Sequence, residues 1–194
     1  MPGGTALRNG GKATIDGVDV DAAWSPGEHL EITAGLEVLD GHYDSFPNGL
    51  FWIYAPNPAR GISNINPPLA PNLAGYKTID TPPFTSALRV SYSPPIRAGI
   101  LDLSVAYNHG GNYFFDADNG KGQLAPALDK QKTMNIVNAS IAWSSSEGRY
   151  SYSLWGKNIT GARYFSVGFE QALLTNVAPA PPVTYGITLA VHFK

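Results

Sequence analysis

The sequence predicts an all-β protein, a segment of an antiparallel transmembrane β-barrel with about seven strands. Three observations predict this fold class. Seven stretches alternate apolar and polar residues, the connections between them are alternately short and long, and charged residues make up only 14% of the chain. Alternation with period two indicates strands with one apolar and one polar face. Short turns at one end and long loops at the other are typical of outer-membrane barrels.

Each alternating stretch is long enough to cross a bilayer. The stretches have 11 to 17 residues, and a tilted membrane-crossing strand needs roughly 9–11. Soluble proteins favour strands of about 5 or 6 residues. In the second stretch, Leu30 and Ile32 alternate with Glu31 and Thr33. The expected strands are 12–24, 29–43, 83–93, 100–114, 134–144, 149–165 and 182–193.

Aromatic residues gather at both ends of the expected strands. The short connections are 25–28, 93–99 and 144–148, and the long ones are 44–82, 115–133 and 166–181. Beside the short turns lie Trp24, Tyr92, Trp143, Tyr150 and Phe193. Beside the long loops lie Tyr43, Tyr113, Phe114, Tyr164 and Phe165. An aliphatic band between two aromatic girdles is the pattern of a strand set that faces lipid, with periplasmic turns and extracellular loops.

The opposite face of the expected strands is small and polar. It carries Thr, Ser, Gly, Ala and Asn together with charged residues, which a sandwich core would not hold. We expect the charged residues to line a wide lumen and contact a plug, with the single arginine offsetting the carboxylates. These residues are Asp19, Asp21, Glu31, Glu37, Arg89 and Asp102.

Composition excludes several classes of function. The chain has no cysteine, so it has no disulfide, thiolate metal site or cysteine nucleophile. The net charge of −2 provides no basic surface for nucleic acid. The chain contains no stretch of 18 apolar residues, so its sequence predicts no transmembrane helix. Since no G-x-S-x-G motif or paired catalytic carboxylates occur, we expect neither an enzyme nor a cofactor.

Several motifs occur in the order in which they are found near the C-terminal end of the members of a known family. They are "NGGKATIDGVDVDAAWSPGEHLEITAGLEVLDGHYDSF", "TIDTPPFTSALRVSYSPP", "NYFFDADN", "SLWGKNITGARYF" and the closing "PPVTYGITLAVHFK". Together they resemble the C-terminal part of the barrel of TonB-dependent outer-membrane receptors, over residues 8–194. The closing motif departs in one detail, because Lys194 follows the aromatic Phe193, on which family members usually end.

The resemblance implies a location, partners and an activity. Such receptors have 22-stranded barrels, of which this chain would form the last third, in the bacterial outer membrane. They take up scarce ligands, most often ferric siderophores. Their partners are lipid, the remainder of the barrel, the plug, the TonB complex acting through the plug, and the barrel-assembly machinery that reads the last strand. Residues 1–194 show a partial barrel domain without plug, TonB box or signal peptide, so we expect a fragment that does not transport by itself.

The loop 44–82 is the predicted ligand-binding segment. Its aromatic rings and one guanidinium suit a catecholate or planar anion through stacking and cation–π contacts. Two histidines at the ends of separate strands are additional candidates, and a self-packed loop is the alternative. The predicted mouth residues are Phe46, Phe51, Trp52, Tyr54, Arg60, His42 and His109.

A calcium loop is suggested by Asp116, Asp118, Asn119 and Gly120. The glycine comes one position early and Ala127 stands where a calcium loop has glutamate, so we expect Asx turns instead. The sequons at Asn138 and Asn158 fall in expected strands, and we assign them no glycan.

Two other readings of the sequence stay open. The first is a small autonomous barrel of the porin or adhesin type, which an even strand number and a signal peptide would favour. The second is a soluble β-sandwich binding module, which would need apolar residues on both inner faces and loops of mixed length.

Overall fold

The computed structural model describes residues 11–49, 54–56, 63–65, 71–121, 128–171 and 174–193. All regular structure in these residues is β, and none forms a helix long and apolar enough to cross a membrane. The long strands are β1 (Lys12–Gly27), β2 (Leu30–Ser45), β5 (Phe84–Tyr92), β7 (Gly99–Gly110), β10 (Met134–Ser145), β11 (Tyr150–Lys157) and β14 (Thr184–Val191). The short strands are β3 (Tyr54–Pro56), β4 (Ser63–Ile65), β6 (Pro95–Ile96), β8 (Tyr113–Phe114), β9 (Lys130–Gln131), β12 (Phe165–Gln171) and β13 (Leu174–Pro179).

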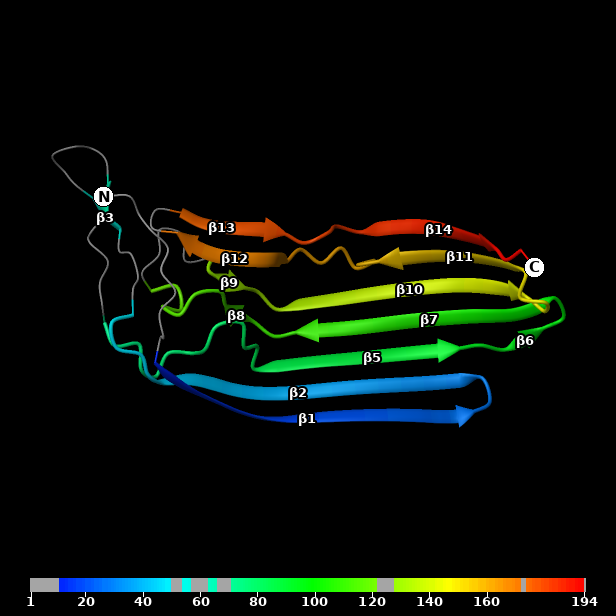
Figure 1. The fold of residues 1–194 in the computed structure, drawn as a ribbon, viewed down its shortest axis with the longest axis horizontal. Helices are drawn as coiled ribbons and strands as arrows, with labels where there is room; N and C mark the ends of the chain where they lie inside the picture. Colours follow the sequence, from blue (N-terminus) through cyan, green and yellow to red (C-terminus); the bar gives the residue numbers. More distant parts are fainter. Residues whose placement is uncertain are drawn as a thin grey trace.

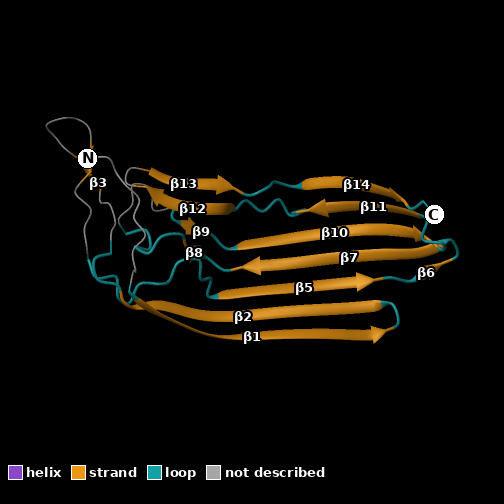
Figure 2. Cartoon of the chain, in the orientation of Figure 1, coloured by secondary structure: helices purple, strands orange, loops and turns teal. Residues whose placement is uncertain are grey.

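The long strands form one open antiparallel sheet in the order β1-β2-β5-β7-β10-β11-β14, with β6 paired to β7 (Figures 1 and 2). Each long strand pairs with the next long strand in the chain, which is an up-and-down meander. This confirms the prediction of seven antiparallel strands in sequence order. The sheet does not close, because β1 and β14 do not pair with each other.

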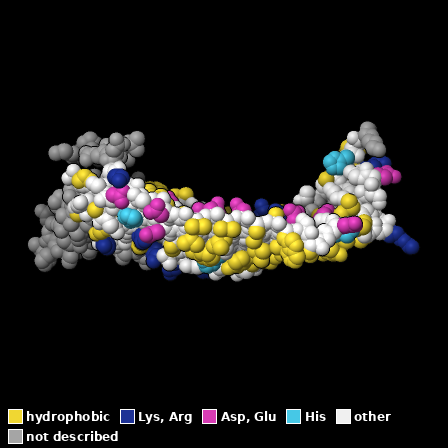
Figure 3. Space-filling view, turned by 90° about the horizontal axis from the view of Figure 1, so that it is seen from below, with side chains coloured by type: hydrophobic (Ala, Val, Ile, Leu, Met, Phe, Trp, Pro, Cys, Tyr) yellow, Lys and Arg dark blue, Asp and Glu magenta, His cyan; other side chains and the backbone are white. Residues whose placement is uncertain are grey.

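The register gathers most large apolar residues on one side of the sheet and most small or polar residues on the other. One row runs through Trp24, Ile32, Val90, Val105, Ala139, Gly156 and Tyr185. Another runs through Glu31, Ser91, Ser104, Ser140, Trp155 and Gly186. The side that carries the first row is called here the apolar face, and the side that carries the second is the polar face. Figure 3 shows hydrophobic side chains spread along one side of the sheet and carboxylates along the other.

The apolar face has no packed core against it. Leu73 and Phe115 are the buried hydrophobic residues of the described part, and both lie outside the sheet. On the sheet, large apolar side chains are exposed; Ile187 is 72% exposed and Leu154 is 53% exposed. A soluble domain buries the apolar face of a sheet against a second layer. The described residues provide no such layer, so the soluble sandwich is disfavoured.

The connections differ in kind at the two ends. At the end called here the turn end, short links join β1 to β2, β5 to β7 and β10 to β11, and Figure 1 shows them together. The opposite end, called the loop end, holds segments 46–83, 111–133 and 158–183. This confirms the predicted alternation of short and long connections.

The structure corrects the sequence-based description of the loop end. Hairpins β3–β4 and β12–β13 and the pair β8–β9 lie within or beside segments that we expected to be plain loops. The expected strand 149–165 is also two strands, because β11 ends at Lys157 and β12 begins at Phe165. Asn158 and Gly161 between them have φ of +51° and +68°, a left-handed conformation that breaks a strand.

Candidate functional site

The residues that flank segment 50–70 on its two sides are hydrogen-bonded to each other at the loop end. Leu73 is 1% exposed, and its backbone N–H donates to the Phe46 carbonyl at 3.0 Å. The Gly49 N–H donates to the Pro71 carbonyl at 2.9 Å, and Asn72 Oδ1 accepts from the Phe46 N–H at 3.2 Å. A side chain at Gly49 would overlap Leu73, because an added Cβ would lie 2.4 Å from its Cγ. The base of the predicted ligand-binding loop is therefore rigid.

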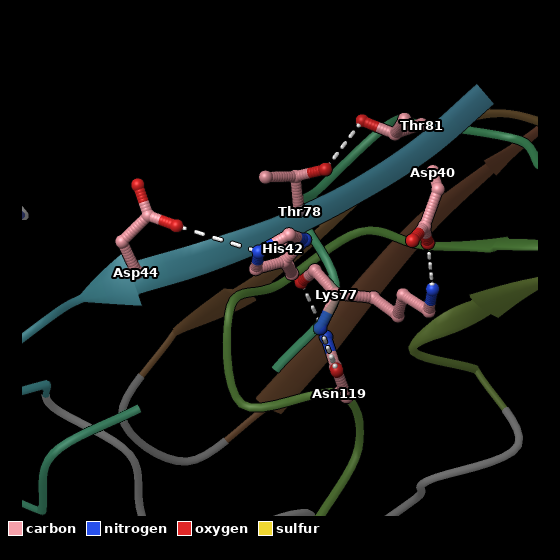
Figure 4. Close-up of polar contacts among 7 residues, drawn as sticks. All are labelled: Asp40, His42, Asp44, Lys77, Thr78, Thr81 and Asn119. Atoms are coloured by element: carbon pink, nitrogen blue, oxygen red, sulfur yellow. Dashed lines mark hydrogen bonds and ion pairs between the residues drawn. The ribbon is translucent and has the colours of Figure 1, made fainter. Parts of the chain in front are cut away.

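A second set of contacts ties this base to the next loop (Figure 4). The Lys77 N–H donates to Asn119 Oδ1 at 2.8 Å, and Asn119 Nδ2 donates back to the Lys77 carbonyl at 3.0 Å. The Lys121 ammonium lies 3.8 Å from the centre of the Tyr76 ring. Since both backbone groups of Lys77 are bound by one side chain, segments 71–82 and 115–121 are held as a unit.

The same view shows charged residues along the end of β2. The Lys77 ammonium pairs with Asp40. Asp44 accepts a hydrogen bond from Thr14 Oγ1 at 2.7 Å and lies 3.4 Å from His42 Nε2. These groups lie at the surface, where solvent screens their charges, so the ion pairs add little to stability. These contacts join the end of β2 to β1 and to segment 71–82.

An aromatic cluster supports the loop end behind β8. The Tyr113 and Phe115 rings meet edge to face at 5.5 Å, and the Phe115 and Phe165 rings are 6.4 Å apart. Burial raises the pKa of the Tyr113 phenol, and the charge of Asp80 adds to this rise. Burial also raises the pKa of the Asp80 carboxyl. The backbone N–H of Asp80 donates to the Phe114 carbonyl at 3.0 Å, which joins the cluster to segment 71–82.

The suggested calcium loop is built as a set of turns. Asp118 Oδ1 accepts from the Gly120 N–H at 2.8 Å, and Asn119 has a φ of +53°. The Asn119 amide is engaged with Lys77 as described above. No group of three or more metal-ligating side chains occurs among the residues that the structure describes.

The predicted mouth residues fall into three groups. Phe46 belongs to the rigid base, where its ring meets the Tyr43 ring at 4.9 Å. Tyr54 lies in β3, where only the backbone is described, and Phe51, Trp52 and Arg60 lie outside the described residues. A role of this loop in ligand binding therefore stays a prediction.

The predicted histidines lie on the strand positions of the apolar face. His109 is paired across the sheet with Asn135, and its Nδ1 lies 2.8 Å from Asn135 Oδ1, which also accepts from the Tyr107 hydroxyl at 2.7 Å. The Phe84 ring lies 5.4 Å from the His109 ring. His42 occupies the same face further out, since it follows Leu36 and Val38 at intervals of two. This placement indicates that the two histidines lie at the boundary of the apolar band and not inside a ligand-binding mouth.

The charged residues predicted for the lumen share the polar face. Asp19 lies opposite Glu37, Thr33 lies opposite Arg89, and Asp102 lies opposite Ala142. Glu37 Oε2 accepts a hydrogen bond from Thr85 Oγ1 at 3.2 Å. No ion pair joins Arg89 to these carboxylates in the described part of the chain. The remaining two predicted residues, Asp21 and Glu31, lie on the same face in the same strands.

Trp155 is a residue of the polar face that the sequence analysis missed. Its ring lies against Gly186, where an added Cβ would be 2.2 Å from the ring, and its Nε1 donates to Thr188 Oγ1 at 3.2 Å. The alternation of Ser151, Ser153 and Trp155 was the available signal. Gly186 is required at this position because the indole occupies the space of its side chain.

The predicted aromatic girdles are placed unequally. At the turn end, Trp24, Tyr92, Trp143 and Tyr150 occupy apolar-face rows, and Trp143 stacks on Tyr152 at 5.5 Å. At the loop end, Tyr43 is on the polar side of β2, and Phe165 packs on Phe115. Positions of these two rings do not support a girdle there. The aromatic residues on the loop-end half of the apolar face are Phe84, Tyr107 and Tyr185.

Comparison with known proteins gives a fold. No protein-family profile matches the chain, and no curated protein sequence is significantly similar to it. The ferric yersiniabactin uptake receptor FyuA of Yersinia pestis is similar in structure, with a TM-score of 0.72 and 21% identity over 96% of this chain. BauA, the ferric preacinetobactin receptor of Acinetobacter baumannii, has a TM-score of 0.59 and 18% identity over 91% of this chain.

The matched region is a minor part of each receptor. This chain spans 24% of the length of FyuA and 21% of that of BauA. At these identities the likeness concerns the fold, and it agrees with the open meander, its two unlike faces and its long connections at one end. The chain therefore shares the fold of a segment of these two receptors.

Proposed function

We propose that this chain forms part of the β-barrel of a TonB-dependent outer-membrane receptor that imports a ferric siderophore. One observation carries the proposal: almost the whole chain superposes on two receptors for ferric siderophores. The exposed apolar face supports it, because that face needs lipid or another apolar layer. The polar face then lines the lumen, and the turn end is periplasmic.

The remaining partners follow from this assignment. The open edges of β1 and β14 pair with the other strands of the barrel, since unpaired backbone groups in lipid cost several kcal/mol each. The carboxylates of the polar face contact a plug, and the TonB complex acts through that plug. The barrel-assembly machinery recognises the last strand. A small autonomous barrel is not favoured, because a seven-strand meander leaves both edges open.

Uptake of iron tests the function. The gene that encodes this chain is deleted in the source organism, and ⁵⁵Fe accumulation from spent iron-limited medium is compared with that of the complemented strain. We expect deletion to reduce energised uptake at least tenfold and a protonophore to abolish it in the complemented strain. Unchanged uptake in the deletion strain would refute the assignment to iron import.

Location is tested separately by fractionation. An antibody against residues 116–132 is used on denatured outer and inner membranes and soluble extract. We expect a band in the outer membrane that is several-fold heavier than 20.7 kDa. A band in the soluble extract would contradict the barrel itself, whatever the cargo.

A further inference from the structure

A cavity of about 880 Å³ lies at the loop end, between segment 128–132 around β9, segment 161–165 and segment 179–183. The sequence pattern predicts ligand contact elsewhere, in loop 44–82. The volume falls within the roughly 300–1,000 Å³ typical of small-molecule sites. The wall includes Lys132, Arg163, Tyr164, Phe165, Pro179 and Val183.

The walls of the cavity are held by buried hydrogen bonds. Asn158 is 4% exposed, and its amide both donates to the Ala162 carbonyl and accepts from the Ala162 N–H, each at 2.9 Å. The same Nδ2 lies 3.4 Å from the Pro181 carbonyl, which connects the two walls. Because the walls are already fixed, a ligand would lose little affinity to ordering them.

The opposite side of the cavity is fixed in the same way. The Gln131 side chain is 1% exposed, and its Oε1 accepts from the Phe165 N–H at 2.9 Å. The Ala180 N–H donates to the Tyr164 carbonyl at 2.9 Å. These bonds hold the backbone of the two aromatic residues in the wall.

The charge of the cavity is opposite to that of the chain. Lys132 and Arg163 line it, whereas none of its described lining residues is Asp or Glu, although the chain has a net charge of −2. Asp129, the carboxylate nearest to the wall in sequence, is fully buried and is not part of the lining. Neither cation has an ion-pair partner among the described residues. A guanidinium and an ammonium above apolar walls suit a ligand with an acid group on a flat apolar body.

We propose that this cavity binds an aromatic carboxylate group, with Arg163 and Lys132 facing the acid and the Tyr164 and Phe165 wall facing the ring. The inference deepens the proposed function and rests on it in one respect, that the aromatic carboxylate is carried by the iron chelate. It assigns ligand contact to the β9–β12 corner in addition to loop 44–82.

Binding of 2,3-dihydroxybenzoate tests the proposal. The whole protein that carries this chain is extracted from outer membranes in detergent, and binding is measured by ligand-observed NMR. We expect the double variant K132E/R163E to bind at least tenfold more weakly than the wild type. The matched control is R149E, an exposed arginine beside a tyrosine ring at the turn end, and it should bind as the wild type does. Neutral catechol should bind weakly and equally to all three proteins.

Three outcomes would overturn the proposal. They are equal affinity of K132E/R163E and wild type, equal loss in R149E, and tighter, variant-dependent binding of dodecyl phosphate, which would mark a lipid site. If K132E/R163E fails to fold, K132Q/R163Q replaces it, with a threefold loss as the smallest supporting result. The binding assay needs no transport. The proposed iron import and the proposed cavity can therefore be refuted independently, the first by ⁵⁵Fe uptake and the second by probe binding.

Discussion

Two adjacent residues of β7, replaced by arginine one at a time, test which face of the sheet meets lipid. Val105 lies on the apolar face between Val90 and Ala139, and Ser104 lies on the polar face between Ser91 and Ser140. Both are near the middle of the strand and of the sheet. An arginine on the lipid face at the bilayer midplane costs about 2–4 kcal/mol, whereas a lumen position carries no such penalty.

The expected effect is large enough to measure in one experiment. A loss of about 2–4 kcal/mol lowers the folding equilibrium constant roughly 30- to 700-fold. Denaturant unfolding of the whole protein in lipid vesicles, followed by tryptophan fluorescence, should show this loss for Val105→Arg. Ser104→Arg should change the unfolding free energy by less than about 1 kcal/mol.

A soluble core would also reject arginine at position 105, so a second readout is needed. The chain has no cysteine, which allows a single nitroxide label at Val105→Cys or Ser104→Cys. The label at 105 should be quenched by lipid-soluble oxygen, and the label at 104 by a water-soluble nickel chelate. Equal destabilisation by the two arginines, or preferential aqueous quenching at 105, would refute the assignment of the faces.

Three further predictions concern local structure. Gly186→Val should displace the Trp155 ring and lower the unfolding free energy by about 1–3 kcal/mol. Gly27→Ala should not lower it, since an added Cβ there meets no atom within 4 Å. Thermal unfolding monitored by tryptophan fluorescence compares the stability of the two variants. Asn158→Ala removes three amide hydrogen bonds at a left-handed position, so limited proteolysis should cut near the β12–β13 hairpin faster, while Asn158→Gly, which tolerates the backbone, should be cut at an intermediate rate. The folded pKa of Asp80 lies above its unfolded value. Its contribution to the stability of segment 71–82 is therefore present below the unfolded pKa and is lost as pH rises through the folded pKa. The proteolysis rate of this segment should rise over that pH range in the wild type and not in Asp80→Asn.

The sheet was predictable from sequence because its register follows from the alternation. A shift of one residue would move every side chain of a strand to the other face. Val18, Val20 and Trp24 could therefore pair only with the matching face of β2, and the structure pairs them so. The same logic placed Asp19 and Glu37 together on the polar face.

The loop end was not predictable in this way, since its order comes from single long-range contacts. Asn119 binds both backbone groups of Lys77 across 42 residues, and Gln131 binds the Phe165 N–H across 34. Neither contact leaves a periodic pattern in the sequence. The hairpin β12–β13 was missed because glycine, asparagine and proline in its strands and flanks indicate a loop.

The sheet lacks two things that different partners supply. Its apolar face lacks a covering layer, and its edge strands β1 and β14 lack neighbours within the described residues. A soluble protein layer would cover the face and leave the edges open, which favours aggregation. Lipid covers the face, but it cannot bond to backbone groups, so it makes closure by further strands obligatory. Both needs are met together in a closed barrel within a membrane, and this joint requirement supports a membrane barrel independently of any similarity to solved structures.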